Sequence, residues 1–212
     1  MHVTSTAARF AIAGAALLSL STLAVATPAL ADSPFTGKTG ALAFTVDTAK
    51  TQFKFLSDAP MEKVPGTADG VTGEITVANA AEPAGTVAKI TVPVARMKTG
   101  NDMRDKHLQG PEWLNAEANK TISFEISKFE VGKVDGSRAS GKAIGKFTMN
   151  GKSIDKTVPV ELAYSADKNI MKITTKFKVS LREHGVKGKG DIIGTKVSSD
   201  VEVDCTLYAA GK

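Results

Sequence analysis

Polar and apolar residues alternate along most of this chain, and no other feature constrains its fold as strongly. In Gln52-Phe53-Lys54-Phe55, for example, both phenylalanines would face one side of a strand and the polar residues the other. Similar runs, each bounded by turn residues, are found at 42–46, 52–55, 73–77, 88–92, 121–126, 142–149, 157–164, 171–181 and 197–208. None is continuously apolar, which argues against a parallel sheet that is buried on both faces. The pattern predicts an all-β, antiparallel sandwich or barrel with one apolar face.

The segment between the fourth and fifth runs departs from this alternation. Thr99 or Asn101 is suited to cap a short helix in which Met103 and Leu108 share an apolar side. Pro111 is suited to begin a second short helix. We therefore predict a short helical segment after the fourth strand.

The N-terminus has the pattern of a signal peptide. Arg9 precedes an uncharged run over 11–26, Pro28 ends that run, and Ala29-Leu30-Ala31 forms a small-x-small cleavage motif. A membrane anchor would need about 20 strongly apolar residues, and this Ala-rich run is shorter. We expect a signal peptide at 1–31, a flexible leader at 32–40 and one domain at 41–212. Cleavage would leave that domain in the periplasm or outside the cell.

Composition narrows the functional classes. A length of 212 residues suits one domain, and the net charge of +5 is too small to predict nucleic-acid binding. Cys205 is the only cysteine, so no disulfide forms within the chain. Alternation places its thiol on the apolar face of the last strand. We therefore expect a buried, unreactive cysteine.

Signals for catalysis are weak. Beyond the signal peptide the only histidines are His107 and His184, and neither has the neighbours of a recognised zinc site. The chain lacks a G-x-S-x-G nucleophile motif and the glycine patterns of nucleotide-binding loops. The sequence thus predicts neither an enzyme, nor a metal, nor a cofactor. Arg104, Asp105 and His107 either fix the helical segment to the strands, which we favour, or contact the headgroup of a ligand.

The apolar face defines a set of candidate cavity residues. Eight-stranded barrels are either filled by their own side chains or hold one small ligand, and periodicity does not distinguish the two. The residues predicted to line a cavity are Phe44, Val46, Phe53, Phe55, Ile75, Ile90, Val92, Ile122, Phe124, Phe147, Met149, Phe177, Val179, Val203 and Cys205 on strands, with Leu108 and Trp113 on the helical segment.

Four motifs resemble those of a known family. The segment at 98–108, KTGNDMRDKHL, resembles the TGN-x-x-RD-x-HL signature of the YceI-like family. The segment at 145–151, GKFTMNG, is similar to its G-x-L-T-I-x-G strand and turn, and FTVD at 44–47 is similar to its opening Y-x-I-D. Trp113-Leu114-Asn115 before the strand at 121–124 resembles a further step of the family pattern, which spans Leu42 to Tyr208. The chain departs from it in a basic stretch at 187–190.

The resemblance implies a lipocalin-like, eight-stranded antiparallel barrel with a long apolar cavity. Such a cavity would take a polyprenyl chain, an isoprenoid quinone or a fatty-acid derivative. We therefore expect binding, storage or transport of an isoprenoid-type lipid in the periplasm. Transient contact with a membrane surface and a homodimer remain open. Two alternatives also remain: a filled barrel with a structural or protein-binding role, and a periplasmic enzyme that acts on such a lipid.

Overall fold

The computed structural model describes residue 2 and residues 33–212, so the predicted signal peptide lies almost entirely outside the described residues. The described chain is all-β apart from one helix, α1 (Asp102–Gln109), and two single 3-10 turns, η1 (Pro83–Gly85) and η2 (Val94–Arg96). The strands are β1 (Leu42–Val46), β2 (Gln52–Asp58), β3 (Lys63–Ala68), β4 (Thr72–Val77), β5 (Thr86–Pro93), β6 (Met97–Lys98), β7 (Thr121–Asp135), β8 (Arg138–Met149), β9 (Lys152–Ser165), β10 (Ile170–Ser180) and β11 (Asp200–Gly211).

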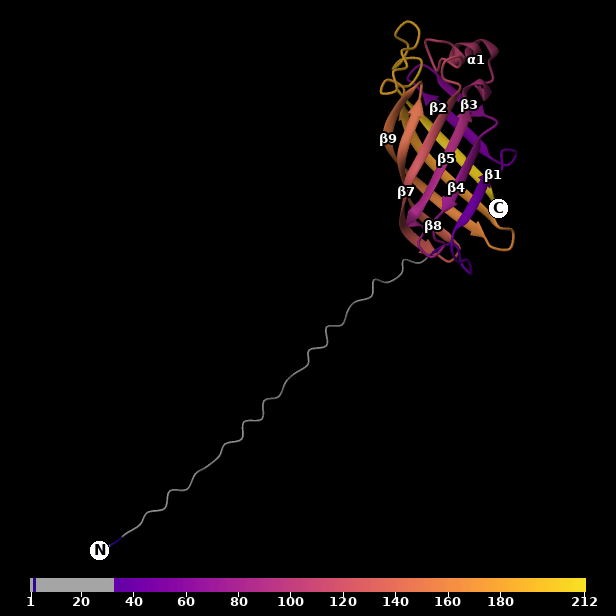
Figure 1. Ribbon diagram of the computed structural model, residues 1–212. Coiled ribbons are helices and arrows are strands. Elements are labelled where there is room, and N and C mark those ends of the chain that lie inside the picture. Colours follow the sequence, from indigo (N-terminus) through magenta and orange to yellow (C-terminus); the bar gives the residue numbers. More distant parts are fainter. Residues whose placement is uncertain (1, 3–32) are drawn as a thin grey trace.

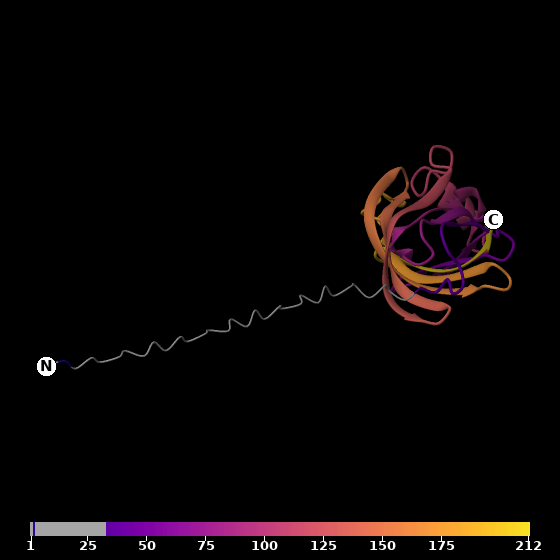
Figure 2. The ribbon, with the colours of Figure 1, turned by 60° about the horizontal axis from the view of Figure 1, so that its bottom comes forward.

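The eleven strands form one sheet, and eight of them close into an antiparallel barrel (Figures 1 and 2). The barrel order is β1-β4-β5-β7-β8-β9-β10-β11, and β1 closes it by pairing with β11. Strand β2 pairs with the preceding part of β11, so β1 and β2 behave as two halves of one bent strand. Strands β3 and β6 continue the sheet from β2 toward the end that carries α1. The predicted fold class is confirmed.

The register follows the alternation in the sequence. Phe53 and Phe55 belong to the hydrophobic core or pack against it, whereas Lys54 between them is exposed. Every strand residue predicted to face inward lies in this core or against it. Side chains alternate between the two faces of a strand, and burial of the apolar face therefore selects one register.

Two strands were not predicted. Strand β3 has the sequence KVPGTA, in which Val64, Gly66 and Ala68 face inward, but a proline and a glycine obscure the pattern. Strand β6 has only two residues.

Helix α1 follows the predicted fourth strand, β5, with β6 between them, which agrees with the prediction. The second helix expected at Pro111 is wrong: residues 110–118 form turns, with Asn115 N donating to Gly110 O at 2.9 Å.

An aromatic cluster closes the end of the barrel opposite α1. Phe35 is only 2% exposed, and its ring centroid lies 5.2 Å from that of Tyr164 and 6.2 Å from that of Phe44. Ser33 Oγ donates a hydrogen bond to Ala80 O beside this cluster. The expected flexible leader at 32–40 must therefore be corrected for Pro34 and Phe35, which are buried inside the barrel end because their apolar side chains cover its opening.

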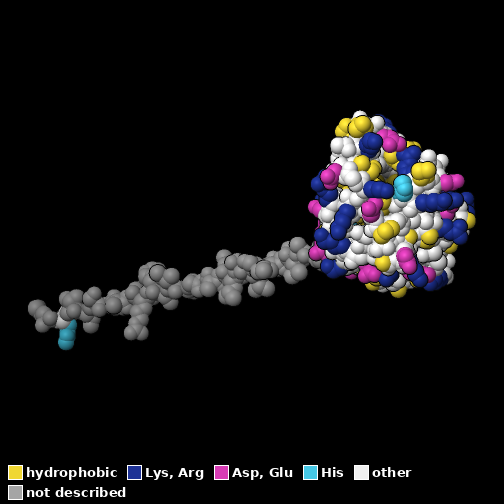
Figure 3. All heavy atoms as spheres, turned by 90° about the horizontal axis from the view of Figure 1, so that it is seen from above, with side chains coloured by type: hydrophobic (Ala, Val, Ile, Leu, Met, Phe, Trp, Pro, Cys, Tyr) yellow, Lys and Arg dark blue, Asp and Glu magenta, His cyan; other side chains and the backbone are white. Residues whose placement is uncertain are grey.

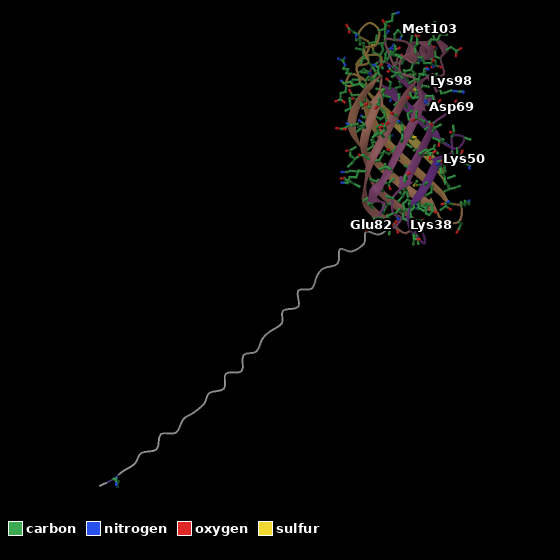
Figure 4. The ribbon with its side chains drawn as sticks, in the orientation of Figure 1. Lys38, Lys50, Asp69, Glu82, Lys98 and Met103 are labelled. Carbon is green, nitrogen blue, oxygen red and sulfur yellow. The ribbon has the colours of Figure 1, made fainter. Side chains whose placement is uncertain are left out.

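The two ends of the barrel differ in what covers them. Lys38 and Glu82 lie at the end closed by aromatic rings, and Met103 on α1 lies at the other end (Figure 4). Met103 is 70% exposed, so the expectation that it shares an apolar side with Leu108 is wrong. Among residues 33–212, no helix combines the length and apolar character that a membrane crossing requires.

Candidate functional site

The interior of the barrel is hollow. It contains a lower cavity of about 110 Å³ and an upper cavity of about 420 Å³. The lower cavity reaches Phe35 at the closed end, and the upper one reaches α1 and the loop between β10 and β11. Four side chains line both cavities: Phe53, Ile122, Phe147 and Val203. We call these four residues the waist.

The lower cavity is almost entirely apolar. Its only polar lining residues are Thr86, Ser123 and Thr175, and it contains no charged group. Ile90 and Ile173 line this cavity, and both are half-buried side chains that pack against the hydrophobic core. An apolar cavity of this size stays dry and accepts small apolar groups. The space below the waist is thus suited to the end of a hydrocarbon chain.

The upper cavity has an apolar interior and a charged mouth. Its depth is lined by residues such as Phe55, Met149 and Val179, and its mouth by Glu62, Arg104, His107, Lys189 and Lys196. Figure 3 shows this end from above: hydrophobic side chains are visible in the middle of the face, and Lys and Arg side chains are frequent around them. The volume lies within the range of about 300–1,000 Å³ that is typical of ligand pockets.

Two segments surround this mouth. Helix α1 begins after Asn101, whose side-chain oxygen accepts a hydrogen bond from Arg104 N at 3.0 Å. The loop at 181–199 folds back on itself, since Leu181 N donates to Ser199 O at 2.8 Å. It meets the segment after α1, where Gly188 N donates to Glu112 O at 2.9 Å. These contacts hold both segments at the open end of the barrel.

The structure brings together most of the predicted cavity residues. All except Phe44 and Val46 line one or both cavities, namely Phe53, Phe55, Ile75, Ile90, Val92, Leu108, Trp113, Ile122, Phe124, Phe147, Met149, Phe177, Val179, Val203 and Cys205. Phe44 and Val46 face inward and are buried in the core, and Phe44 packs against Tyr164 at the closed end of the barrel. Phe44 is covered there because Phe35, which alternation did not assign to the interior, occupies the space in front of it.

The three polar residues of α1 take separate roles. Arg104 Nη1 lies 2.8 Å from Glu62 Oε1, an ion pair that ties α1 to the loop between β2 and β3. Asp105 Oδ1 accepts hydrogen bonds from Thr99 N and Thr99 Oγ1, both at 2.6 Å. His107 is exposed and lines the mouth. Arg104 and Asp105 therefore attach the helix to its surroundings through different partners rather than through one shared network.

Sequence reasoning missed the residues that the loops contribute. Lys189 belongs to the basic stretch at 187–190, so its charge was visible, but nothing in the sequence placed it at a cavity mouth. Glu62 and Lys196 gave no signal, because loop positions have no periodicity that reports their direction.

Burial shifts the pKa of two side chains in or near the cavities. Burial raises the pKa of the Cys205 thiol to about 12, and Asp204 beside it adds to the effect. Burial lowers the pKa of His184, whose Nδ1 lies 3.0 Å from Lys152 O. Within residues 33–212, no group of three or more His, Cys, Asp and Glu side chains is arranged to hold a metal ion.

Comparison with known proteins agrees with this geometry. The family model of the YceI-like domain matches residues 44–209. No curated protein sequence is significantly similar to the chain. Among solved structures, BcnA of Burkholderia cenocepacia is 21% identical, with a TM-score of 0.68 over 78% of this chain and 99% of that protein.

Two further structures share the fold. A polyisoprenoid-binding domain from Saccharophagus degradans, implicated in plant cell wall breakdown, is 13% identical, with a TM-score of 0.64 over 81% of this chain and 99% of that domain. The YceI protein of Campylobacter jejuni is 21% identical, with a TM-score of 0.58 over 73% of this chain and 88% of that protein. At these identities the likeness concerns the fold.

Proposed function

The chain belongs to the YceI-like family, and we propose that its barrel binds one isoprenoid-type lipid and stores or carries it in the periplasm. The lipid chain would extend through the upper cavity and past the waist into the lower one. The neighbour from Saccharophagus degradans is described as polyisoprenoid-binding, which supports this ligand class. The family and the cavity together support a lipid-binding barrel.

The observation that carries the proposal is the apolar interior. A cavity of about 420 Å³ and one of about 110 Å³ share the four waist residues, and charged residues line only the mouth of the upper one. Each methylene that leaves water for such a site contributes roughly 0.8 kcal/mol, so a long chain binds without strong polar contacts. A barrel with a filled core would offer no such space.

We propose binding rather than catalysis. Within residues 33–212, the imidazole of His107 at the mouth forms no hydrogen bond or ion pair that would orient it as a base. The polar side-chain groups of the lower cavity are hydroxyl and thiol groups, and the thiol of Cys205 has a raised pKa that keeps it protonated. Incubation with a quinone or a polyprenyl phosphate would reveal turnover, which would overturn this part of the proposal.

Extraction of the purified protein tests lipid binding directly. Extraction with organic solvent followed by mass spectrometry should recover one apolar amphiphile per chain.

If the protein is isolated empty, titration with farnesol provides a second test. Trp113 is the only tryptophan and lines the upper cavity, so its fluorescence should report binding there. We expect saturable change in its fluorescence. The Trp113→Phe variant should lose the signal and still retain farnesol by mass spectrometry. A protein that yields no lipid and binds no farnesol would contradict the proposal.

The periplasmic location has its own test. Expression of the full chain in a Gram-negative host should place the protein in the osmotic-shock fraction, with Asp32 as its N-terminal residue. A cytoplasmic protein that retains residues 1–31 would contradict the location and leave the lipid-binding proposal to its separate test.

A further inference from the structure

The charged residues that line the cavities lie only at the mouth, and most of them are cationic. Arg104, Lys189, Lys196 and Glu62 line the upper cavity, together with His107, whereas no charged side chain lines the lower one. Arg104 comes from α1, Glu62 from the loop between β2 and β3, and the lysines from the loop between β10 and β11. Three separate segments thus meet at this site, and the three cations from α1 and the loop between β10 and β11 outnumber the single carboxylate of Glu62.

The two lysines have no internal partner. Glu62 is already paired with Arg104, at 2.8 Å between Oε1 and Nη1. Among residues 33–212, neither Lys189 nor Lys196 forms an ion pair, and Asp191 on the same loop forms none with either. Both lysines are exposed while lining the cavity, so their ammonium groups remain hydrated and accessible at its opening.

We infer that the mouth selects a lipid with an anionic headgroup, a carboxylate or a phosphate, over a neutral lipid with the same chain. This inference rests on the proposed function, because it assumes that the chain of the lipid occupies the cavity. The headgroup would remain at the rim between Lys189 and Lys196, where the two ammonium groups and the headgroup pair without full loss of water. The uncharged interior below would take the hydrocarbon, so charge and apolar surface together orient the ligand.

The expected size of the effect follows from the exposure of the site. Ion pairs at exposed positions contribute about 0.2–1 kcal/mol each, and tenfold in affinity corresponds to about 1.4 kcal/mol. Two such pairs should therefore make an anionic lipid bind about tenfold tighter than its neutral analogue. The preference should shrink as salt concentration rises, because exposed charges are screened.

Three ligands that share the same hydrocarbon chain test the inference. Farnesol, farnesoate and farnesyl phosphate differ only in their headgroups, and Trp113 fluorescence or calorimetry measures their affinities for the full mature protein. At low salt we expect farnesoate or farnesyl phosphate, or both, to bind about tenfold tighter than farnesol. The ranking of the two anions then identifies whether carboxylate or phosphate is preferred.

Matched variants assign the preference to the mouth. The double variant Lys189→Gln/Lys196→Gln should bind both anions no tighter than it binds farnesol, so the preference for an anionic headgroup is lost. The double variant Lys38→Gln/Lys168→Gln removes the same charge elsewhere: Lys38 lies at the closed end (Figure 4), and Lys168 in the turn between β9 and β10. This control should keep the wild-type preference.

Two outcomes would overturn the inference. Equal affinity for all three ligands in the wild type would do so while leaving the proposed function intact. A preference that survives Lys189→Gln/Lys196→Gln, or that Lys38→Gln/Lys168→Gln abolishes, would show that the mouth is not its source. Failure of farnesol and both anions to bind would instead contradict the proposed function itself, and the inference with it.

Discussion

The ring of Phe55 lies against the neighbouring strand, β3, in the wall of the upper cavity. A Cβ at the opposite residue, Gly66, would overlap this ring, so the glycine provides the space that the ring occupies. Phe55 is buried and lines the upper cavity, whereas the next residue on β2, Leu56, points to the other face and pairs with Glu202. A side chain introduced at position 55 therefore enters the cavity, whereas the same side chain at position 56 lies on the outer face.

This difference predicts the outcome of two charge insertions. Phe55→Arg would place an unpaired charge among apolar side chains, which costs several kcal/mol, so the protein should lose its lipid or melt at a clearly lower temperature. Leu56→Arg would set the same charge beside Glu202 on the outer face and should change neither property appreciably. Lipid content and melting temperature are the measurements. Equal behaviour of the two variants would contradict the register of β2.

Cys205 illustrates burial at the wall of the lower cavity. It is 5% exposed, and burial raises the pKa of its thiol to about 12, so almost no thiolate is present at neutral pH. We expect a polar thiol reagent to label the native protein very slowly and the denatured protein at once. Labelling should speed up after lipid extraction, because Cys205 lines the cavity. Rapid stoichiometric labelling of the native, loaded protein would refute this prediction.

At the scale of elements, His184 joins the loop at 181–199 to the turn between β8 and β9. Its Nδ1 lies 3.0 Å from Lys152 O, and its carbonyl oxygen accepts a hydrogen bond from Asn150 Nδ2 at 3.3 Å. Its ring meets that of Phe147 edge-on, with centroids 5.4 Å apart. The loop that carries Lys189 and Lys196 is thereby anchored to the barrel by a buried, neutral imidazole.

This burial predicts a dependence of stability on pH. The pKa of His184 lies below its usual value of 6.5 in the folded protein, so the unfolded chain binds this proton first as the pH falls. Stability should therefore decrease on acidification from about pH 6.5 down to the lowered pKa, with no contribution from this group at higher pH. Denaturant unfolding of wild type and His184→Gln across this range measures it. A wild type with no steeper decline than the variant would contradict the assignment.

At the scale of the whole molecule, closure of the sheet creates one interior that two cavities share. Eight strands give a barrel just wide enough for side chains to fill it or for one small ligand to enter. Here the waist residues lie between the two cavities, and the lower cavity reaches Phe35. The length of hydrocarbon that the protein accepts should accordingly depend on passage through the waist.

Narrowing the waist should shorten the preferred ligand. In the wild type, affinity for a series of prenyl alcohols should rise with length, by roughly fourfold per buried methylene, until the chain reaches the closed end. Val203→Phe should stop this rise at a shorter chain, while geraniol, which fits above the waist, keeps its affinity. Geraniol binding and an intact melting transition serve as controls. An unchanged length profile would show that ligands do not pass the waist.

Much of this architecture follows from the sequence alone. Alternation determines which side of each strand is apolar, because side chains point to opposite faces at a period of two, and Phe53, Phe55, Val203 and Cys205 lie where this rule puts them. Asn101 is confirmed as the residue that caps α1. Strand β3 escaped prediction because small residues and Pro65 give its inward face little hydrophobic contrast.

Only the tertiary structure decided whether the apolar faces meet or enclose a space. Strand number, tilt and register set the width of a barrel, and these arise from pairing between distant segments rather than from any local pattern. Distant contacts also decided that Phe35 covers Phe44 at one end of the barrel. They likewise bring Lys189 and Lys196 to the opening that α1 borders. A loop residue carries its charge in the sequence, but the direction of its side chain depends on the packing of the whole chain.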